Sequence, residues 1–247
     1  PSNPAGQYNA LLGGNPDLQP EKATTKTVGV VLQPTFLPRF ALTVDYFDIE
    51  VSGAIQGFGA DAILADCVNN STATSIRPSC GLVNRDPGRS IWLTSGGFVR
   101  NLPTNIGGVQ TRGIEVNGSY SHRLGGLGNL SASLIGTYLD SYEVDNGLTP
   151  VYDCRGLFGS TCGVPAPEWR HKARLSLQTP GGVGLSLQWR HFSGVRADSS
   201  SDNPSLAGAF VFDPGARIGA QNYFDLASTV TIADQFNFRF GVNNIFD

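Results

Sequence analysis

Apolar and polar residues alternate with a period of two along nearly all of this 247-residue chain. In one such run Val183, Leu185, Leu187 and Trp189 fall on one face, while small or polar residues fall on the other. This period is typical of β-strands whose two faces meet different surroundings, and convincing helical stripes are missing. The pattern therefore predicts an all-β fold.

Neighbouring runs pair into hairpins. Residues 179–182, with the sequence Thr-Pro-Gly-Gly, are all that separate the run 169–178 from the run just described, which predicts a tight antiparallel turn. With residues 98–123 taken as one long strand kinked near glycine, the chain contains about eight strands of this kind.

The connections between the strands are of two kinds, which strictly alternate along the chain. Short turns lie near residues 34–38, 124–128, 180–183 and 233–235. Long polar segments occupy residues 53–97, 143–167 and 196–220. Bacterial outer-membrane barrels have this arrangement, because their periplasmic turns are short and their external loops long. The sequence thus predicts an antiparallel transmembrane β-barrel segment of about eight long meander strands, with short periplasmic turns and long extracellular loops.

Strand length separates this prediction from a soluble β-sandwich or propeller, whose strands alternate as well. Several runs match the roughly 9–11 residues that cross a bilayer at a tilt, whereas soluble strands usually have about five or six. Aromatic residues near the ends of the apolar runs, such as Trp169, Trp189 and Phe224, fit interfacial girdles. Two edge strands would stay unpaired, so an incomplete barrel is expected.

Composition excludes other classes of protein. Charged residues make up 15% of the chain, against about 25% in an ordinary soluble domain. The formal net charge of −3 argues against a nucleic-acid-binding protein, which usually carries a basic excess. No stretch approaches the roughly 18 consecutive apolar residues of a membrane-spanning helix, which excludes a helical membrane protein.

The four cysteines form two local pairs, Cys67/Cys80 and Cys154/Cys162, each within a polar segment. Their spacing suits two small loop disulfides, which indicate an oxidising compartment. Metal binding is the alternative, but the chain has no Cys-X-X-Cys motif and its three histidines lie far from both pairs in the sequence. We therefore expect two disulfides, no metal site and no cofactor.

Four segments carry a family resemblance. Residues 14–21 read GNPDLQPE, residues 42–49 read LTVDYFDI, residues 111–115 read TRGIE and residues 241–247 read GVNNIFD. In this order they resemble the N-P-x-L-x-P-E, VDYFDI, TRGIE and GVxNLFD segments of TonB-dependent outer-membrane receptors. Each motif is short, but together they extend across nearly the whole chain.

The resemblance implies a 22-stranded barrel that is filled by an N-terminal plug domain. This sequence includes neither a plug nor the family's final strand, so residues 1–247 are expected to be one partial barrel domain. The implied partners are outer-membrane lipid, the receptor's own plug and through it TonB–ExbB–ExbD, and a small-molecule ligand. No nucleic-acid partner is expected.

The implied function is energised uptake of a scarce nutrient, such as a ferric siderophore, a vitamin or a carbohydrate, across a bacterial outer membrane. A passive porin or surface β-barrel is one alternative, and a secreted soluble β-protein for adhesion or carbohydrate binding is another. A fragment without the plug is expected neither to gate nor to couple to TonB.

Charged residues opposite the apolar runs are the candidates for contact with ligand or plug. They are Asp45, Glu115, Arg170, Lys172, Arg174, Arg190, Asp225 and Arg239. Most are expected to pair with one another across strands. Arg170, Lys172 and Arg174, with Arg190 on the paired strand, form a positive stripe suited to an anionic ligand or to carboxylates on the plug, and we favour the plug.

Two other places in the sequence attract attention. The alternation changes phase between Asp45 and Asp48, which predicts a β-bulge or the rim of the barrel. In the first long loop, residues 60–67 are expected to form one short helical turn. Asp61 and Asp66 are ligand candidates there, and the alternative is that they are helix-end and solvent residues.

Catalytic patterns are missing from the sequence. It contains no G-x-S-x-G, H-E-x-x-H or P-loop motif. His171 and His191 continue apolar runs toward a predicted interface, and paired carboxylates such as Asp45 and Asp48 are too common to indicate acid–base catalysis. We expect a protein that is not an enzyme.

Overall fold

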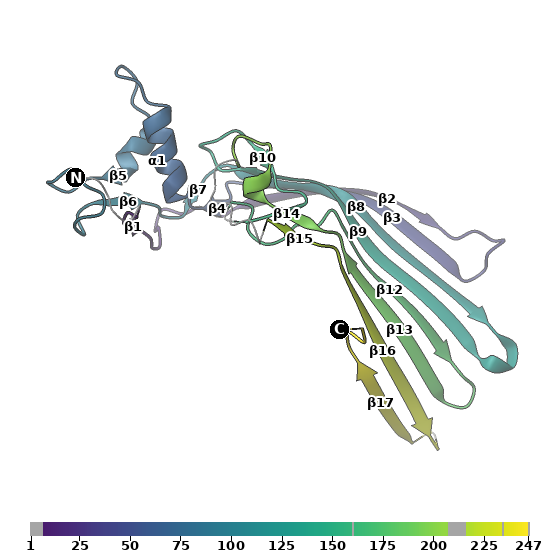
Figure 1. Cartoon of the computed structure of the whole chain (residues 1–247). Helices are drawn as coiled ribbons and strands as arrows, with labels where there is room; N and C mark the ends of the chain where they lie inside the picture. Colours follow the sequence, from purple (N-terminus) through teal and green to yellow (C-terminus); the bar gives the residue numbers. More distant parts are fainter. Residues whose placement is uncertain (1–6, 160, 207–215, 234, 247) are drawn as a thin grey trace. The chain divides into compact units, whose positions relative to one another are not determined.

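The computed structural model describes residues 7–159, 161–206, 216–233 and 235–246, so Asp234 of the last predicted turn, Asp247 of the last motif and residues 207–215 of the third long segment lie outside the described residues. Its main sheet has the strand order β2-β3-β8-β9-β12-β13-β16-β17 (Figure 1), in which each strand pairs with the next long strand along the chain. The strands are β2 (Lys22–Leu32), β3 (Phe40–Ser52), β8 (Gly108–Arg123), β9 (Asn129–Asp145), β12 (Trp169–Gln178), β13 (Val183–Phe192), β16 (Gln221–Ile232) and β17 (Phe236–Val242). The predicted eight-stranded meander is confirmed.

The hairpin of β12 and β13 shows why the alternation produces two faces. Its register places Leu175 opposite Leu187 and Arg174 opposite Gln188, so apolar residues lie opposite apolar ones and polar residues opposite polar ones. The turn needs glycine at position 182, whose φ of 77° is unfavourable for other residues. One side of the hairpin is therefore apolar and the other polar.

The same register continues into the neighbouring strands. Leu187 lies opposite Leu226, and Leu226 lies opposite Val242. These side chains form the apolar face of the sheet, and they stay exposed: 47% of Leu175 and 59% of Val242 remain accessible. A broad exposed apolar surface requires a membrane or a partner to cover it.

The remaining elements lie mainly in the long connections. They are β1 (Ala10–Leu11), β4 (Ile55–Gln56), α1 (Ala60–Asn69), the 3-10 helix η1 (Pro78–Leu82), β5 (Val83–Asn84), β6 (Phe98–Arg100), β7 (Thr104–Asn105), η2 (Gly125–Leu127), β10 (Tyr152–Asp153), β11 (Leu157–Phe158), β14 (Val195–Ala197), η3 (Asp198–Ser200) and β15 (Arg217–Ile218). None of the described helices is long and apolar enough to cross a membrane.

The chain divides into two compact units. The first comprises Pro1–Thr24, Glu50–Gln110 and Glu143–Tyr152, and the second comprises Thr25–Ile49, Thr111–Tyr142 and Asp153–Asp247. A single partial barrel domain over residues 1–247 stays a prediction.

The first unit has its own small core. Ile63 of α1 packs with Ile91 and Val99, and Val99 belongs to the small sheet β1-β6-β5. Helix α1 has ten residues, so the expected single helical turn is too short. Ile63 is fully buried, which explains why the helix extends here: its apolar face is covered by the rest of the loop.

The prediction of one strand over residues 98–123 is wrong. Residues 98–100 form β6, which pairs with β1 and β5; residues 104–105 form β7, which pairs with β4; and only β8 belongs to the main sheet. Pro103 lacks the N–H that a continuous ladder needs, and Gly107 has a φ of 56°. The chain therefore breaks twice before β8.

Candidate functional site

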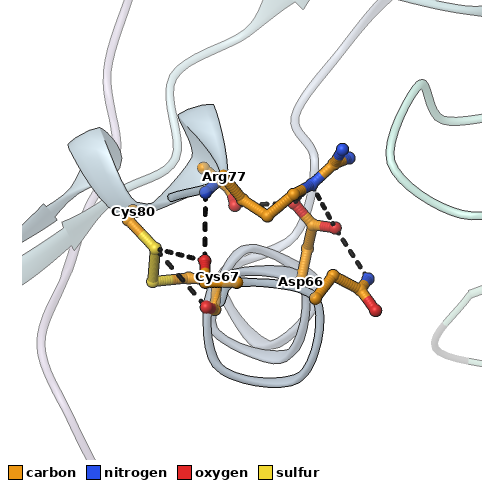
Figure 2. Close-up of a disulfide and its surroundings, with 7 residues drawn as sticks. Asp66, Cys67, Arg77 and Cys80 are labelled. Atoms are coloured by element: carbon orange, nitrogen blue, oxygen red, sulfur yellow. Dashed lines mark hydrogen bonds and ion pairs between the residues drawn. A yellow bond between two sulfur atoms is a disulfide. The ribbon is translucent and has the colours of Figure 1, made fainter. Parts of the chain in front are cut away.

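Both predicted disulfides are present. The Cα atoms of Cys67 and Cys80 lie 4.8 Å apart, and those of Cys154 and Cys162 lie 5.5 Å apart. All four cysteines are thereby consumed, so the alternative that they bind a metal is wrong. The first disulfide ties α1 to η1, as Figure 2 shows.

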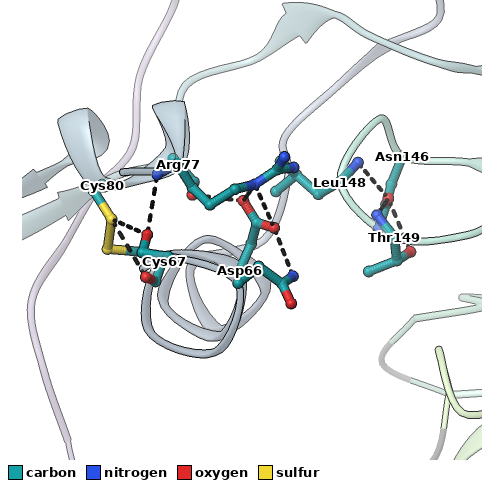
Figure 3. A network of polar contacts seen from close by, with 10 residues as sticks. Asp66, Cys67, Arg77, Cys80, Asn146, Leu148 and Thr149 are labelled. Atoms are coloured by element: carbon teal, nitrogen blue, oxygen red, sulfur yellow. Dashed lines mark hydrogen bonds and ion pairs between the residues drawn. A yellow bond between two sulfur atoms is a disulfide. The ribbon is translucent and has the colours of Figure 1, made fainter. Parts of the chain in front are cut away.

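Asp66 lies beside this disulfide and is only 4% exposed. Its carboxylate accepts hydrogen bonds from the Ser79 hydroxyl at 2.6 Å, the Asn70 amide at 2.9 Å and the Arg77 Nε at 3.2 Å (Figure 3). Burial raises the pKa of the Asp66 carboxyl, but these hydrogen bonds outweigh burial and lower its pKa below the ordinary value. Asp66 is a charged, buried group that joins α1 to η1, and is not the solvent residue of the alternative interpretation.

Asp61 differs from Asp66, because it is exposed. Its carboxylate accepts a hydrogen bond from the Tyr8 hydroxyl. Burial, together with this carboxylate, raises the pKa of Tyr8. Asp61 thus lies on the surface of the first unit and is the more accessible of the two predicted loop candidates.

In the second unit, the carboxylate of Asp198 organises the other disulfide loop. It accepts hydrogen bonds from the backbone N–H groups of Thr161, at 2.8 Å, and Cys162, at 3.0 Å. Asp198 is 2% exposed. Sequence reasoning missed it, because the residues it binds lie 36 and 37 positions away.

The polar face of the sheet carries the predicted cations. Arg190 binds the Asp225 carboxylate through two hydrogen bonds of 2.9 and 3.0 Å. The Gln188 side chain donates to Asp225 at 3.0 Å and accepts from Arg174 at 2.7 Å, and the backbone N–H of Asn244 also donates to Asp225, at 3.0 Å. Arg190 and Asp225 thus pair across strands as expected, but the other six predicted charges form no ion pair with one another among the described residues, so the expectation that most would pair is wrong. Gln188 and Asn244 were not among the predicted site residues.

Arg170 and Lys172 are exposed and make no ion pair with any described residue. Arg170 and Glu115 line a groove of about 520 Å³, whose walls include Thr137 and Tyr142. Arg239 lines a second, polar groove of about 210 Å³ together with Arg174. Four of the predicted residues thus line two grooves, while Arg190 and Asp225 belong to the network around Asp225.

In β3 the apolar residues change from even to odd positions between Asp45 and Asp48, and the apolar face of the strand ends there. Phe40, Leu42 and Tyr46 belong to that face, but the next residue on it, Asp48, forms an ion pair with Arg112 at 3.6 Å. Strand β3 continues to Ser52 through this point. A charged residue replaces apolar ones where a membrane-spanning strand passes from lipid into water, so this position fits the predicted rim of the barrel. Asp45 faces the other way and lies against Gly29, where a Cβ would collide with its carboxylate.

Aromatic and histidine side chains gather on the apolar face at the long-loop ends of β12 and β13. The Trp169 indole donates to His171 Nδ1 at 2.8 Å, and the His171 ring meets the Trp189 ring edge-on at 4.3 Å. Trp189 stacks with Phe224 at 6.0 Å. This row lies where the sequence predicts an interfacial girdle.

Comparison with known proteins agrees with this geometry. Residues 2–245 match the sequence model of the family described as TonB dependent receptor-like, beta-barrel. Curated proteins provide no match to the chain.

Solved structures share the fold at low sequence identity. The ferric enterobactin receptor PfeA of Pseudomonas aeruginosa, in complex with enterobactin, aligns with a TM-score of 0.62 and 16% identity over 98% of this chain. The iron transporter FrpB of Neisseria meningitidis has a TM-score of 0.55 and 14% identity over 96% of the chain, and the siderophore receptor PirA of Acinetobacter baumannii has 0.55 and 12% over 96%. The chain spans 29% of the length of each of these proteins.

Proposed function

Because the chain belongs to the TonB dependent receptor-like β-barrel family, we propose that it forms wall and external loops of an outer-membrane receptor that takes up a scarce nutrient with energy supplied through TonB. The family places the chain in the bacterial outer membrane and among receptors rather than enzymes. This location excludes the secreted soluble alternative. The observation that carries the proposal is the family match over a sheet with one apolar and one polar face.

In this proposal the two units have different roles. The first unit, with its own core and disulfide, presents Asp61 and neighbouring loop residues for ligand capture. The polar face of the sheet lines the lumen. Arg190 is already neutralised by Asp225, whereas Arg170 and Lys172 have no ion-pair partner among the described residues. These two cations are available for carboxylates of the plug.

Among the nutrient classes, a ferric siderophore has the most support. The solved structures with this fold include a ferric enterobactin receptor, an iron transporter and a siderophore receptor. A substrate screen that identifies a vitamin or a carbohydrate would contradict this assignment.

Uptake by the full-length receptor is expected to depend on TonB. A strain lacking the gene, complemented with the full-length gene, is tested for growth and for uptake of labelled ferric siderophores, vitamins and sugars, with and without functional TonB. Accumulation against a gradient that disappears without TonB supports the proposal. Uptake that is equal in both backgrounds would make the protein a passive pore.

Charge reversal at the two free cations separates plug contact from ligand contact. For the full-length Arg170→Glu/Lys172→Glu variant, we expect uptake to fall roughly tenfold, because losing the charge pairs with the plug costs about 1.4 kcal/mol. The affinity for the ligand at the cell surface should stay unchanged. Arg123→Glu, at the short-turn end of β8, is the control and keeps normal uptake. A weaker surface affinity in the double variant would instead assign these cations to the ligand.

A further inference from the structure

The apolar face contains a groove of about 560 Å³ that the proposed transport function does not use. It crosses strands β3, β8, β9, β12, β13 and β16, and all of its lining residues belong to the second unit. Gly118 has only a hydrogen and Ala132 and Ala173 only a methyl group in its lining, while Phe40, Leu42 and Trp189 are large neighbours. The hollow therefore exists because three adjacent strands carry small residues where the rest of the face carries large ones.

One end of the groove has polar groups. Trp189 donates its indole N–H to Asn222 Oδ1 at 2.9 Å, and His191 Nδ1 lies 2.9 Å from the same oxygen. The exposed Asn222 amide nitrogen has no partner among the described residues. This end of the groove lies where β13 and β16 meet the long loop, because the short turn at residues 179–182 is at the opposite end of β13.

His171 adds a second hydrogen-bond donor, two residues from Ala173 on the same face of β12. An indole N–H only donates, so His171 Nδ1 accepts the bond from Trp169 and the neutral ring carries its proton on Nε2. Nε2 is buried and has no partner within the described part of the chain. A donor without accessible surface cannot reach an external ligand, so of these two donors only the exposed Asn222 amide is open to a lipid.

We propose that this groove holds one acyl chain of a lipid from the outer leaflet, with an ester or phosphate oxygen of the lipid accepting a hydrogen bond from the exposed Asn222 amide. The groove is continuous with the membrane-facing surface, so hydrocarbon is its natural occupant. The tryptophans and histidines mark the depth at which a lipid changes from hydrocarbon to polar groups. The site needs only membrane exposure of this face, so it stands whatever the receptor transports.

Photo-crosslinking of the full-length receptor tests the proposal. The receptor is placed in nanodiscs whose phospholipid includes a fraction with a diazirine in the acyl chain, and the labelled peptides are mapped by mass spectrometry. We expect labelling of residues 129–138 and 169–192 to exceed that of residues 226–242 roughly fourfold, the preference that one additional buried methylene provides. Even labelling around the wall would overturn the proposal.

Variants that fill the groove with larger side chains provide the matched comparison for the labelling experiment. Ala132→Leu/Ala173→Leu is expected to remove the excess labelling, and Ala173→Leu alone should halve it or more if the double variant does not fold. Ser228→Leu adds the same side chain to the apolar face outside the groove, opposite Leu185, and should keep the excess. Unchanged labelling in the groove variants would contradict a lipid in this groove.

Discussion

Replacing Leu187 with arginine is expected to destabilise the full-length barrel by about 2–4 kcal/mol, the cost of a cation on the lipid face near the bilayer midplane. Leu187 lies in the middle of β13 and continues the apolar row formed with Leu175 and Leu226. Leu175 and Leu226, its direct neighbours across the strands, carry no charge that could neutralise the added arginine. Urea unfolding of the receptor in lipid vesicles measures the loss.

Ser186→Arg is the matched control, because it adds the same cation one residue away on the other face of β13. Ser186 lies opposite Ser176 and Ala227 on the polar face, where water or a plug accommodates charge. Its effect should stay within about 0.5 kcal/mol. Equal destabilisation by both variants would mean that the two faces do not differ in their surroundings.

Removing the first disulfide is expected to have the second large effect. Cys67 and Cys80 close a loop with a sequence separation of 13, and loss of such a cross-link costs about 3 kcal/mol by the loop-closure estimate. The first unit buries few residues, chiefly Ile63, Ile91 and Val99, so little else opposes opening of α1. In the full-length Cys67→Ala/Cys80→Ala variant, hydrogen exchange of residues 60–69 should accelerate roughly 100-fold.

Cys154→Ala/Cys162→Ala is the control, since this disulfide belongs to the second unit. It should accelerate exchange around residues 154–162 and leave α1 unchanged. If α1 keeps its full protection after loss of Cys67–Cys80, the hydrogen bonds of Asp66 with Ser79 and Arg77 hold the helix without the disulfide.

The sheet was predictable because its signal is local and repeated. Each hairpin combines period-two runs with a short turn, as in residues 169–192, and neighbours in the sheet are neighbours in sequence. The strand predicted over residues 98–123 failed for the opposite reason. Its first residues pair with β1 and β5 of the first unit, and no period-two pattern reports such distant partners.

The candidate site was predictable only in part. The alternation placed Arg170, Lys172, Arg174 and Arg190 on one face, and the structure agrees with that placement. It could not reveal that Arg190 is neutralised by Asp225, because the pair lies 35 residues apart. Asp66 shows the same limit: its burial depends on Arg77 and Ser79, which only the folded loop brings to it.

The sequence by itself determined the two-faced sheet, the alternation of short and long connections, and the two local disulfides, because these depend on residues that are near one another in the chain. Tertiary structure alone decided which charges are free and where the apolar face is hollow. Both properties depend on the register between strands, which brings Ala173 next to Leu134 and Trp189 and leaves Lys172 beside Arg190. Register arises from backbone pairing across the whole sheet.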